Sequence, residues 1–295
     1  MVHKASKDQL VLGIPKGSLQ ESTLDLFARA GYEISVSSRS YFPSINAERM
    51  SVVLFRAQEM SRYVEDGIVD LGLTGHDWIC ENGSDVHEVC ELTYSKATSR
   101  PAKWVLAVPN ESPVAKPEDL DGGVVATELV RVAEKYFADK GLRVKVEFSW
   151  GATEVKARFL DGIVDITETG SSLRANKLRI LDTIMTSTTR LIANHDSMRN
   201  EWKREKAENI ALLLRGAIEA REKVGLKMNA PSANLQAITA LLPAEKSPTI
   251  SSLGDPDWVA VEVVVEERVE RELVPQLKRA GATGIITYPL KKVIP

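Results

Sequence analysis

Cysteine, histidine and long apolar runs are all scarce in this sequence. The two cysteines among 295 residues, Cys80 and Cys90, form no CxxC pattern, so we do not expect a disulfide framework. We expect instead that both are reduced thiols in a cytoplasmic protein. The four histidines have no metal-ligand spacing. No apolar run is long enough to cross a bilayer, and a secretory signal is not expected before the first apolar segment.

An excess of charge of one sign is also missing. The formal net charge is −3, which gives no reason to expect nucleic acid or an anionic membrane as partner. Any anion-binding site must therefore be built locally. With 295 residues, 43% of them hydrophobic, the chain is long enough for two or three domains.

Strands and helices are predicted to alternate along the first two thirds of the chain. Buried strands that end at proline or glycine and run into amphipathic helices indicate an α/β fold. The predicted strands cover residues 10–15, 51–55, 69–75, 104–108, 123–126, 144–148, 162–167 and 190–194, and the predicted helices cover 22–30, 58–66, 128–140 and 198–224. The second block of strands is expected to form a small parallel-type sheet.

The rhythm changes after Gly225. Strands at 226–229, 249–252, 258–265 and 283–288, with helices at 232–242 and 269–280, give the order βαββαβ of a ferredoxin-like module. We therefore predict three domains. The first lobe comprises residues 1–105 and 187–224, the second lobe 106–186, and the C-terminal module 225–295.

The most informative segment runs from Asp161 to Asn176. A buried strand carries Asp165, and a turn rich in hydroxyl groups follows it and opens a helix. Glycine lets backbone N–H groups approach an anion closely, and neighbouring hydroxyls add further donors. Nearby carboxylates suit ribose hydroxyls or a Mg²⁺ ion carried by pyrophosphate. The alternative is an ordinary strand–turn–helix in which Thr and Ser are helix caps.

Five motifs in the same order resemble those of ATP phosphoribosyltransferases. They are IPKGSLQE (14–21), YVEDGIVDLGLTGHDW (63–78), GATEV (151–155), VDITETGSSLRAN (164–176) and SPTISSLGDPDWVAVEVVV (247–265). The resemblance spans nearly the whole chain. The last motif is similar to the long, regulated form of the family, which carries its own regulatory domain.

The resemblance implies a fold and a reaction. Members have two lobes similar to periplasmic binding proteins, with the active site between them, and the long form adds the C-terminal domain. They join N1 of the adenine of ATP to C1 of phosphoribosyl pyrophosphate, release pyrophosphate with inversion, and thereby begin histidine biosynthesis. Mg²⁺ is required and is expected mainly on the substrate pyrophosphate, with Asp165 as a candidate protein ligand.

The resemblance also implies the site residues. Phosphoribosyl pyrophosphate is expected at Asp165, Glu168, Thr169, Gly170, Ser171, Ser172 and Leu173, and ATP at Lys16, Gly17, Ser18, Leu19, Arg56, Asp77 and Glu154. Asp165, Lys16 and Arg56 are the candidate catalytic residues. Considered alone, Lys16 is more typical of a solvated loop lysine and Arg56 of a surface ion-pair partner. Asp77 is also compatible with a helix N-cap, and Glu154 with a first-turn acid favoured by the helix dipole.

Regulation and assembly follow from the same resemblance. Histidine and AMP or ADP are expected as inhibitors, and a homo-oligomer of dimers and hexamers is expected. The histidine pocket is predicted at Asn229, Thr249, Ser252, Val264 and Gly284, although Asn229 also suits a cap of the helix that begins near Pro231.

Two features depart from the family pattern, and two other functions compete with the enzyme. Ser18 stands where many members have arginine, and the link between Glu154 and Asp165 is short. The alternatives are a non-catalytic two-lobe protein that binds a small molecule, and a ligand-sensing regulator. The regulator would need a DNA-binding element, and no basic recognition helix is evident.

Overall fold

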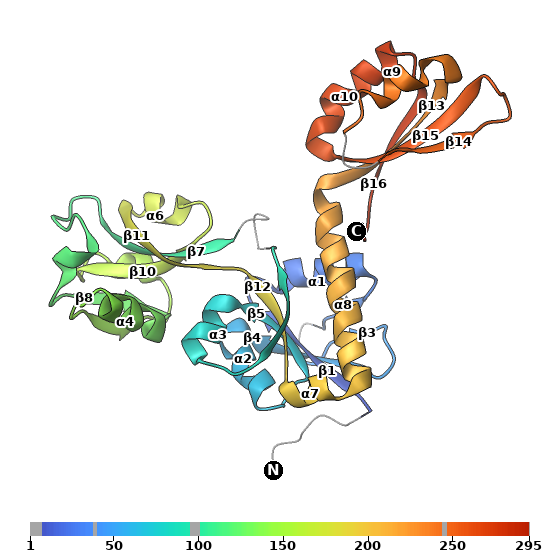
Figure 1. Ribbon diagram of the computed structural model, residues 1–295. Coiled ribbons are helices and arrows are strands. Elements are labelled where there is room, and N and C mark those ends of the chain that lie inside the picture. Colours follow the sequence, from blue (N-terminus) through green and yellow to red (C-terminus); the bar gives the residue numbers. More distant parts are fainter. Residues whose placement is uncertain (1–7, 38–39, 95–100, 244–246, 295) are drawn as a thin grey trace. The chain divides into compact units, whose positions relative to one another are not determined.

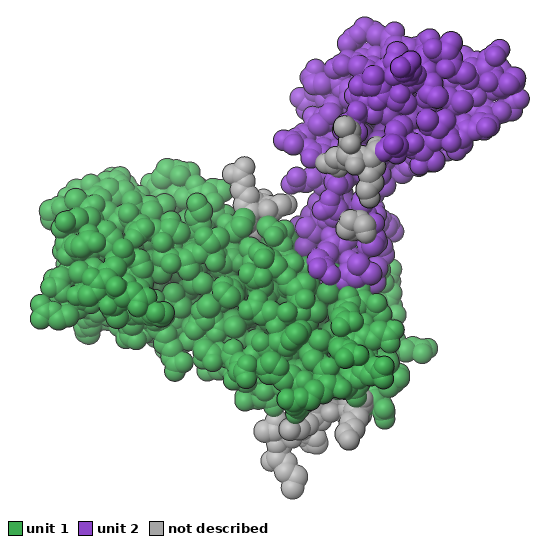
Figure 2. All heavy atoms as spheres, viewed as in Figure 1, with its two compact units in different colours: residues 1–211 green, residues 212–295 purple. Residues whose placement is uncertain are grey.

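The chain folds into two compact units, residues 1–211 and 212–295, in a computed structural model that describes residues 8–37, 40–94, 101–243 and 247–294 (Figure 2). The boundary falls inside helix α8 (Glu201–Glu219). Unit 1 holds two α/β lobes, each built on a five-stranded sheet (Figure 1). Within these described ranges, no helix is both long and apolar enough to span a membrane.

The first lobe has the strand order β4-β1-β5-β12-β6. The strands are β1 (Leu10–Lys16), β4 (Met50–Arg56), β5 (Leu71–Gly75), β6 (His87–Leu92) and β12 (Thr189–Ala193), and the helices are α1 (Gln20–Ala30), α2 (Ala57–Glu65), α3 (His76–Asn82) and α7 (His195–Arg199). A two-stranded pair, β2 (Ile34–Ser35) with β3 (Ser44–Ile45), accompanies them. Strand β1 is parallel to β4 and β5, so their carboxyl ends share one sheet edge.

The second lobe has the strand order β11-β7-β10-β8-β9. The strands are β7 (Ala102–Pro109), β8 (Val124–Thr127), β9 (Lys145–Phe148), β10 (Gly162–Thr167) and β11 (Leu178–Ser187), and the helical segments are η1 (Pro117–Leu120), α4 (Val130–Asp139), α5 (Thr153–Lys156) and α6 (Ser171–Ala175). Phe137 of α4 and Val125 of β8 are fully buried in its core. Strands β8, β9 and β10 are parallel, and their carboxyl ends therefore also lie together.

Glycine ends helices where the sequence predicts it. Gly31 closes α1 in the left-handed conformation with φ 100°, and Gly141 follows α4 with φ 72°. Both positions would strain any residue that carries a Cβ atom.

Three expectations about the elements are wrong. The second sheet is mixed, not parallel, because β7 runs antiparallel to both β10 and β11. Strands β6 and β11 were not predicted, since charged residues interrupt their apolar pattern and β11 contains two irregularities. The predicted helix over 198–224 is split at Asn200, whose side chain accepts a hydrogen bond from Lys203 N (3.1 Å) and caps α8. It also ends earlier than predicted, at Glu219, because residues 223–224 already lie in a strand.

Unit 2 has the expected ferredoxin-like topology. Its sheet order is β14-β15-β13-β16, with all neighbours antiparallel. The elements are η2 (Ala220–Glu222), β13 (Lys223–Pro231), η3 (Ser232–Asn234), α9 (Leu235–Thr239), β14 (Thr249–Ser252), β15 (Trp258–Glu266), α10 (Glu267–Arg279) and β16 (Thr283–Pro289). Leu226, Met228 and Leu277 are buried between the sheet and its helices. The predicted fold class, two α/β lobes and a C-terminal ferredoxin-like module, is confirmed.

The predicted domain limits fall inside strands. Residue 105 lies in β7, which belongs wholly to the second sheet, and the division at 224/225 lies in β13. The chain returns from the second lobe to the first at Thr188, between β11 and β12.

Candidate active site

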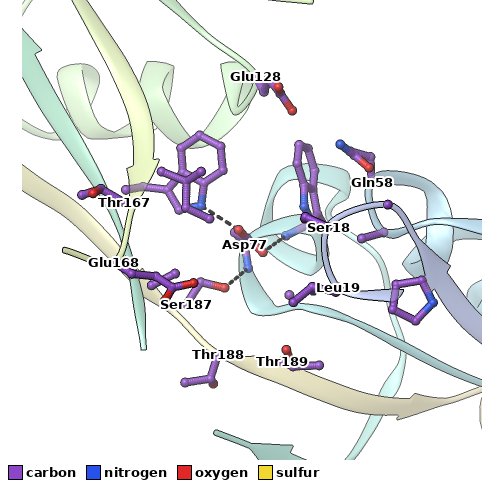
Figure 3. Close-up of a pocket in the computed structure, with 18 of the residues that line it drawn as sticks. Ser18, Leu19, Gln58, Asp77, Glu128, Thr167, Glu168, Ser187, Thr188 and Thr189 are labelled. Carbon is purple, nitrogen blue, oxygen red and sulfur yellow. Dashed lines mark hydrogen bonds between the residues drawn. The ribbon is translucent and has the colours of Figure 1, made fainter. Parts of the chain in front are cut away.

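A pocket of about 720 Å³ lies in unit 1 and is lined by both lobes (Figure 3). It takes up the carboxyl ends of β1, β4 and β5 from the first lobe and of β8 and β10 from the second. Ligands of α/β proteins commonly bind at such ends. Of the residues predicted for substrates, the pocket is lined by Lys16, Gly17, Ser18, Leu19, Arg56, Asp77, Asp165, Glu168, Thr169, Ser171 and Ser172.

The first-lobe wall carries the two cations of the pocket. Lys16 and Arg56 are cross-strand partners at the ends of the parallel strands β1 and β4. Gly17 follows Lys16 with φ 116°, and a Cβ there would lie 3.5 Å from Arg56 Nη1. Lys16 Nζ lies 3.8 Å from the ring centroid of Tyr41 and lowers the pKa of its hydroxyl, chiefly by hydrogen bonding. This wall is suited to phosphate groups.

The second-lobe wall is a turn held in shape by its own hydroxyl groups. Gly170 N donates to Thr167 Oγ1 (2.8 Å), and Thr169 Oγ1 donates to Ser171 Oγ (3.0 Å). Gly170 is left-handed, with φ 73°, and α6 begins directly after it. The first amides of a helix have no partner within the helix and are available to an anion.

Three predicted residues do not line this pocket. Glu154 is outside the lining, and its carboxylate accepts a hydrogen bond from Ser172 Oγ of the turn. Leu173 is 2% exposed and packs in the lobe core, so its backbone alone remains for a ligand. A Cβ on Gly170 would point toward Arg174 Nη1 (2.8 Å).

Asp165 is a pocket acid whose titration is strongly perturbed. Burial raises its pKa to about 6, and the nearby carboxylates of Glu154 and Glu128 add to the effect. A bond from Ile166 N (2.8 Å) opposes the rise only in part. A cation or a positively charged transition state beside the Asp165 carboxylate would therefore stabilise its ionised form.

Asp77 has a different environment from the one predicted. It is not a helix cap, because Gly75 is the N-cap of α3 and Asp77 lies within the first turn. The side chain is buried, and it accepts hydrogen bonds from Trp78 N (3.0 Å) and from Trp104 Nε1 (2.6 Å) of the second lobe. Burial raises its pKa despite these bonds. Asp77 thus joins the two lobes at the floor of the pocket.

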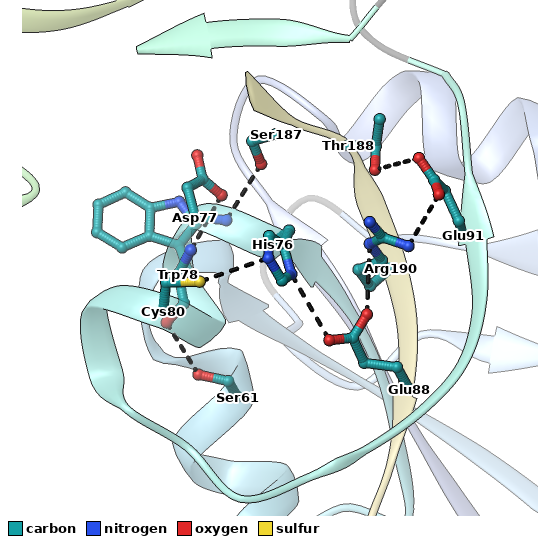
Figure 4. Close-up of polar contacts among 10 residues, drawn as sticks. All are labelled: Ser61, His76, Asp77, Trp78, Cys80, Glu88, Glu91, Ser187, Thr188 and Arg190. Atoms are coloured by element: carbon teal, nitrogen blue, oxygen red, sulfur yellow. Dashed lines mark hydrogen bonds and ion pairs between the residues drawn. The ribbon is translucent and has the colours of Figure 1, made fainter. Parts of the chain in front are cut away.

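A polar network holds the segment that crosses between the lobes (Figure 4). Asp77 N donates to Ser187 Oγ (3.1 Å), and Thr188 Oγ1 donates to Glu91 Oε1 (2.8 Å). Arg190 bridges Glu91 (3.0 Å) and Glu88 (3.4 Å). The crossing segment is therefore tied to α3 on one side and to β6 on the other.

The structure adds pocket residues that the sequence did not reveal. They are Gln58, Trp78, Trp104, Glu128 and Ser187 to Thr189, together with other lining residues. Glu128 directly follows β8, and the rule that ligands bind at carboxyl ends of parallel strands was the available signal for it. Within the residues described, no group of three or more His, Cys, Asp and Glu side chains is placed to hold a metal ion.

The residues predicted to bind histidine lie on one sheet of unit 2, though not all on one face. Asn229 pairs with Ala260, and a Cβ on Gly284 would lie 3.7 Å from Asn229 Nδ2. Thr249 and Val264 share the exposed face of Asn229, because paired residues of antiparallel strands point the same way. By the same register Ser252, opposite Val259, points to the other face, and Ser251, opposite Ala260, points to that of Asn229.

Comparison with known proteins identifies the family. The ATP phosphoribosyltransferase family model matches residues 56–216, and the model of the HisG C-terminal domain matches residues 220–292. The ATP phosphoribosyltransferase of Chlorobaculum parvum is 59% identical over 98% of this chain and 99% of its own length, and that of Pelotomaculum thermopropionicum is 57% identical over 97% and 100%. The solved ATP phosphoribosyl transferase (HisG:HisZ) complex from Thermotoga maritima contains a chain that is 28% identical, with a TM-score of 0.60 over 72% of this chain and 99% of the matched one. The chain therefore belongs to the ATP phosphoribosyltransferase family.

Proposed function

We propose that this protein transfers the phosphoribosyl group of phosphoribosyl pyrophosphate to N1 of ATP, releasing pyrophosphate, as the first step of histidine biosynthesis. The observation that carries the proposal is the shared pocket. Two walls of opposite character, one cationic and one rich in hydroxyls and carboxylates, face the same space. A reaction between two phosphorylated substrates needs both walls.

The 5-phosphate is assigned to the turn Thr169 to Ser172. Hydroxyl groups and the first amides of α6 supply donors there, and no basic residue of the turn is required. Glu154, bound to Ser172, fixes one hydroxyl of the turn and acts as a positioning residue. The pyrophosphate is assigned to Lys16 and Arg56 on the opposite wall, which neutralise the leaving group.

Asp165 is assigned to the reacting sugar. Breaking the C1–O bond leaves positive charge on the ribosyl ring, and a carboxylate beside it stabilises that charge. The raised pKa of Asp165 means that burial and the neighbouring carboxylates disfavour its ionised form. The stabilisation is therefore greatest when positive charge develops, as differential binding of the transition state requires.

Mg²⁺ is assigned to the substrates. The positive charges of the pocket do not neutralise the negative charges of two polyphosphate substrates. Its lining has two basic residues, Lys16 and Arg56, and four acidic ones, Asp77, Glu128, Asp165 and Glu168. A divalent ion bound to the pyrophosphate would neutralise part of this negative charge and polarise the leaving group.

The test is pyrophosphate release from ATP and phosphoribosyl pyrophosphate with Mg²⁺. Release that requires both substrates is expected, with a phosphoribosylated nucleotide as second product. Binding of either compound without pyrophosphate release would instead support a non-catalytic two-lobe binding protein.

Feedback by histidine is assigned to the exposed face of the unit 2 sheet that carries Asn229, Thr249 and Val264. An amide, a hydroxyl and the backbone around Gly284 offer partners for an amino acid. Millimolar histidine should lower wild-type activity, and Asn229→Ala and Thr249→Ala should keep activity and lose that response. Equal inhibition of wild type and both variants would remove the assignment. AMP and ADP are proposed as inhibitors at the nucleotide site.

A homo-oligomer, with dimers that assemble into hexamers, is proposed from the family. The solved relative is a complex named HisG:HisZ, whereas this chain carries a match to the HisG C-terminal domain within itself. Light scattering with and without histidine is the measurement, and a monomer under all conditions would contradict the proposal.

A further inference from the structure

One part of the active-site pocket is not accounted for by phosphates, sugar or pyrophosphate. Glu128, Gln58, Trp78 and Trp104 line it, and none of them was assigned above to either substrate. Figure 3 shows Glu128 and Gln58 at the same side of the pocket, opposite Thr188 and Thr189. The two indole rings meet edge to face, with centroids 6.2 Å apart. Because Trp104 is buried, Trp78 supplies the accessible aromatic surface of this corner, beside one carboxylate and one carboxamide.

Glu128 is placed by the fold and is half-buried. It follows β8, which is parallel to β10, so it lies at the sheet edge that also presents the end of β10. Among the residues that the structure describes, its carboxylate has no hydrogen-bond or ion-pair partner. A half-buried carboxylate without a protein partner is available to accept hydrogen bonds from a ligand.

The chemistry of this corner excludes a phosphate and favours a nucleobase. A carboxylate repels phosphate, while it accepts hydrogen bonds from an amino group. Aromatic rings bind a planar base, and a carboxamide such as that of Gln58 both donates and accepts, which matches the edge of adenine.

We propose that Glu128 is a catalytic residue that accepts a hydrogen bond from the 6-amino group of the ATP adenine and stabilises the positive charge that this base acquires in the reaction. The inference rests on the proposed function and names a contact of the nucleophile within it. Gln58 is the second polar contact of the base.

The charge follows from the electron count. The lone pair of N1 forms the new bond to C1 of the ribosyl group, and the C1–O electron pair leaves with pyrophosphate. The purine thereby gains one positive charge, which spreads onto the 6-amino nitrogen. A hydrogen bond from that group to a carboxylate strengthens as the charge develops, so it lowers the barrier more than it tightens ground-state binding.

The experiment compares wild type with Glu128→Gln, which keeps the shape and removes the charge. We expect kcat/KM for ATP to fall about 10- to 100-fold, with the KM for phosphoribosyl pyrophosphate nearly unchanged. Glu128→Asp keeps the charge and should recover part of the loss. Glu134→Gln, an exposed acid on α4 of the same lobe, is the matched control and should behave as wild type.

A nucleotide without the amino group identifies the contact. Purine riboside 5′-triphosphate is measured as an inhibitor competitive with ATP, and Glu128→Gln should leave its inhibition constant within about twofold while weakening ATP binding. Three outcomes would overturn the proposal. They are an equal loss of affinity for both nucleotides, an effect on phosphoribosyl pyrophosphate alone, and no effect on ATP. Circular dichroism and thermal unfolding show whether the variants are folded.

Failure of the broader function would look different. In that case wild type itself releases no pyrophosphate from the two substrates, before any variant is compared.

Discussion

The pentapeptide Asp-Gly-Ile-Val-Asp occurs once in each lobe of unit 1, with opposite consequences for its final aspartate. It covers residues 66–70 in the first lobe and 161–165 in the second, and in both cases Thr-Gly and a helix follow after three further residues. Asp70 is 4% exposed and accepts bonds from Lys203 Nζ (2.7 Å) and Ser197 Oγ (2.6 Å). Asp165 faces the pocket, with carboxylates as its charged neighbours.

The two following glycines also differ. Gly75 has an extended backbone, with φ −72°, and is required because a Cβ would lie 1.9 Å from Asp77 Oδ1. Gly170 is left-handed and is required for its backbone angle. Similar local sequences thus give a strand, a glycine and a helix in both lobes. Lys203 of α8 pairs with Asp70, whereas no cation of the described residues pairs with Asp165. The tertiary surroundings of Asp165, and not the pentapeptide that contains it, leave its carboxylate available for the reaction.

The largest effect on stability is expected from replacing Asp70, the aspartate that forms the buried ion pair. Asp70→Asn leaves the Lys203 ammonium buried without its counter-ion, so we expect the free energy of unfolding to fall by about 3–5 kcal/mol. Urea denaturation measures it. Asp70→Asn combined with Lys203→Met should recover part of the loss, and additive losses would show that the ion pair is not the cause.

Replacing Asp165, the aspartate in the pocket, should lower activity and raise stability. Asp165→Asn should lower kcat about 100-fold, because it removes negative charge beside the reacting sugar. It should also stabilise the fold by about 1–2 kcal/mol at pH 7–8, because the raised pKa means that the ionised form is disfavoured in the folded protein. Asp139→Asn, on the exposed surface of α4, is the control. An unchanged kcat at saturating substrates would remove Asp165 from the reaction.

The pH dependence sharpens the comparison further. With the pKa of Asp165 raised to about 6, kcat/KM for phosphoribosyl pyrophosphate should fall up to tenfold per pH unit below that value, as the carboxylate is protonated. The folded chain binds more protons than the unfolded one between about pH 4 and 6, so this group's contribution to stability declines as the pH rises through that window. A profile of Asp165→Asn with the same inflection would assign it to another group.

The smallest effect is expected at the left-handed glycine. Gly170→Ala should cost about 1–2 kcal/mol of backbone strain and raise the KM for phosphoribosyl pyrophosphate several-fold. Gly141→Ala is the matched control, since Gly141 has φ 72° with open space around it. It should lose similar stability without any change in KM, and an equal KM change in both would mean that the turn is not the binding site.

Sequence reasoning found the parts of the pocket that are contiguous in the chain. The turn Thr169 to Ser172 and the loop after β1 concentrate polar residues beside a buried strand, so their pattern is visible locally. Glu128, Gln58 and Trp104 stand alone in their segments, and strand order alone brings them to the pocket. The burial of Asp77 likewise depends on a tryptophan 27 positions away in the other lobe.

The indole of Trp104 gives the cleft an intrinsic optical reporter. Its Nε1–H bond to the Asp77 carboxylate lies at the floor of the pocket, so a ligand that changes this bond alters the polarity around the excited ring and shifts the emission. Trp150 is 92% exposed and accessible to iodide, whereas Trp104 is 2% exposed. Iodide therefore quenches Trp150 preferentially, and the remaining emission contains that of Trp104 together with those of the partly buried Trp78, Trp202 and Trp258. A change in this remainder follows substrate binding without a label and before any turnover.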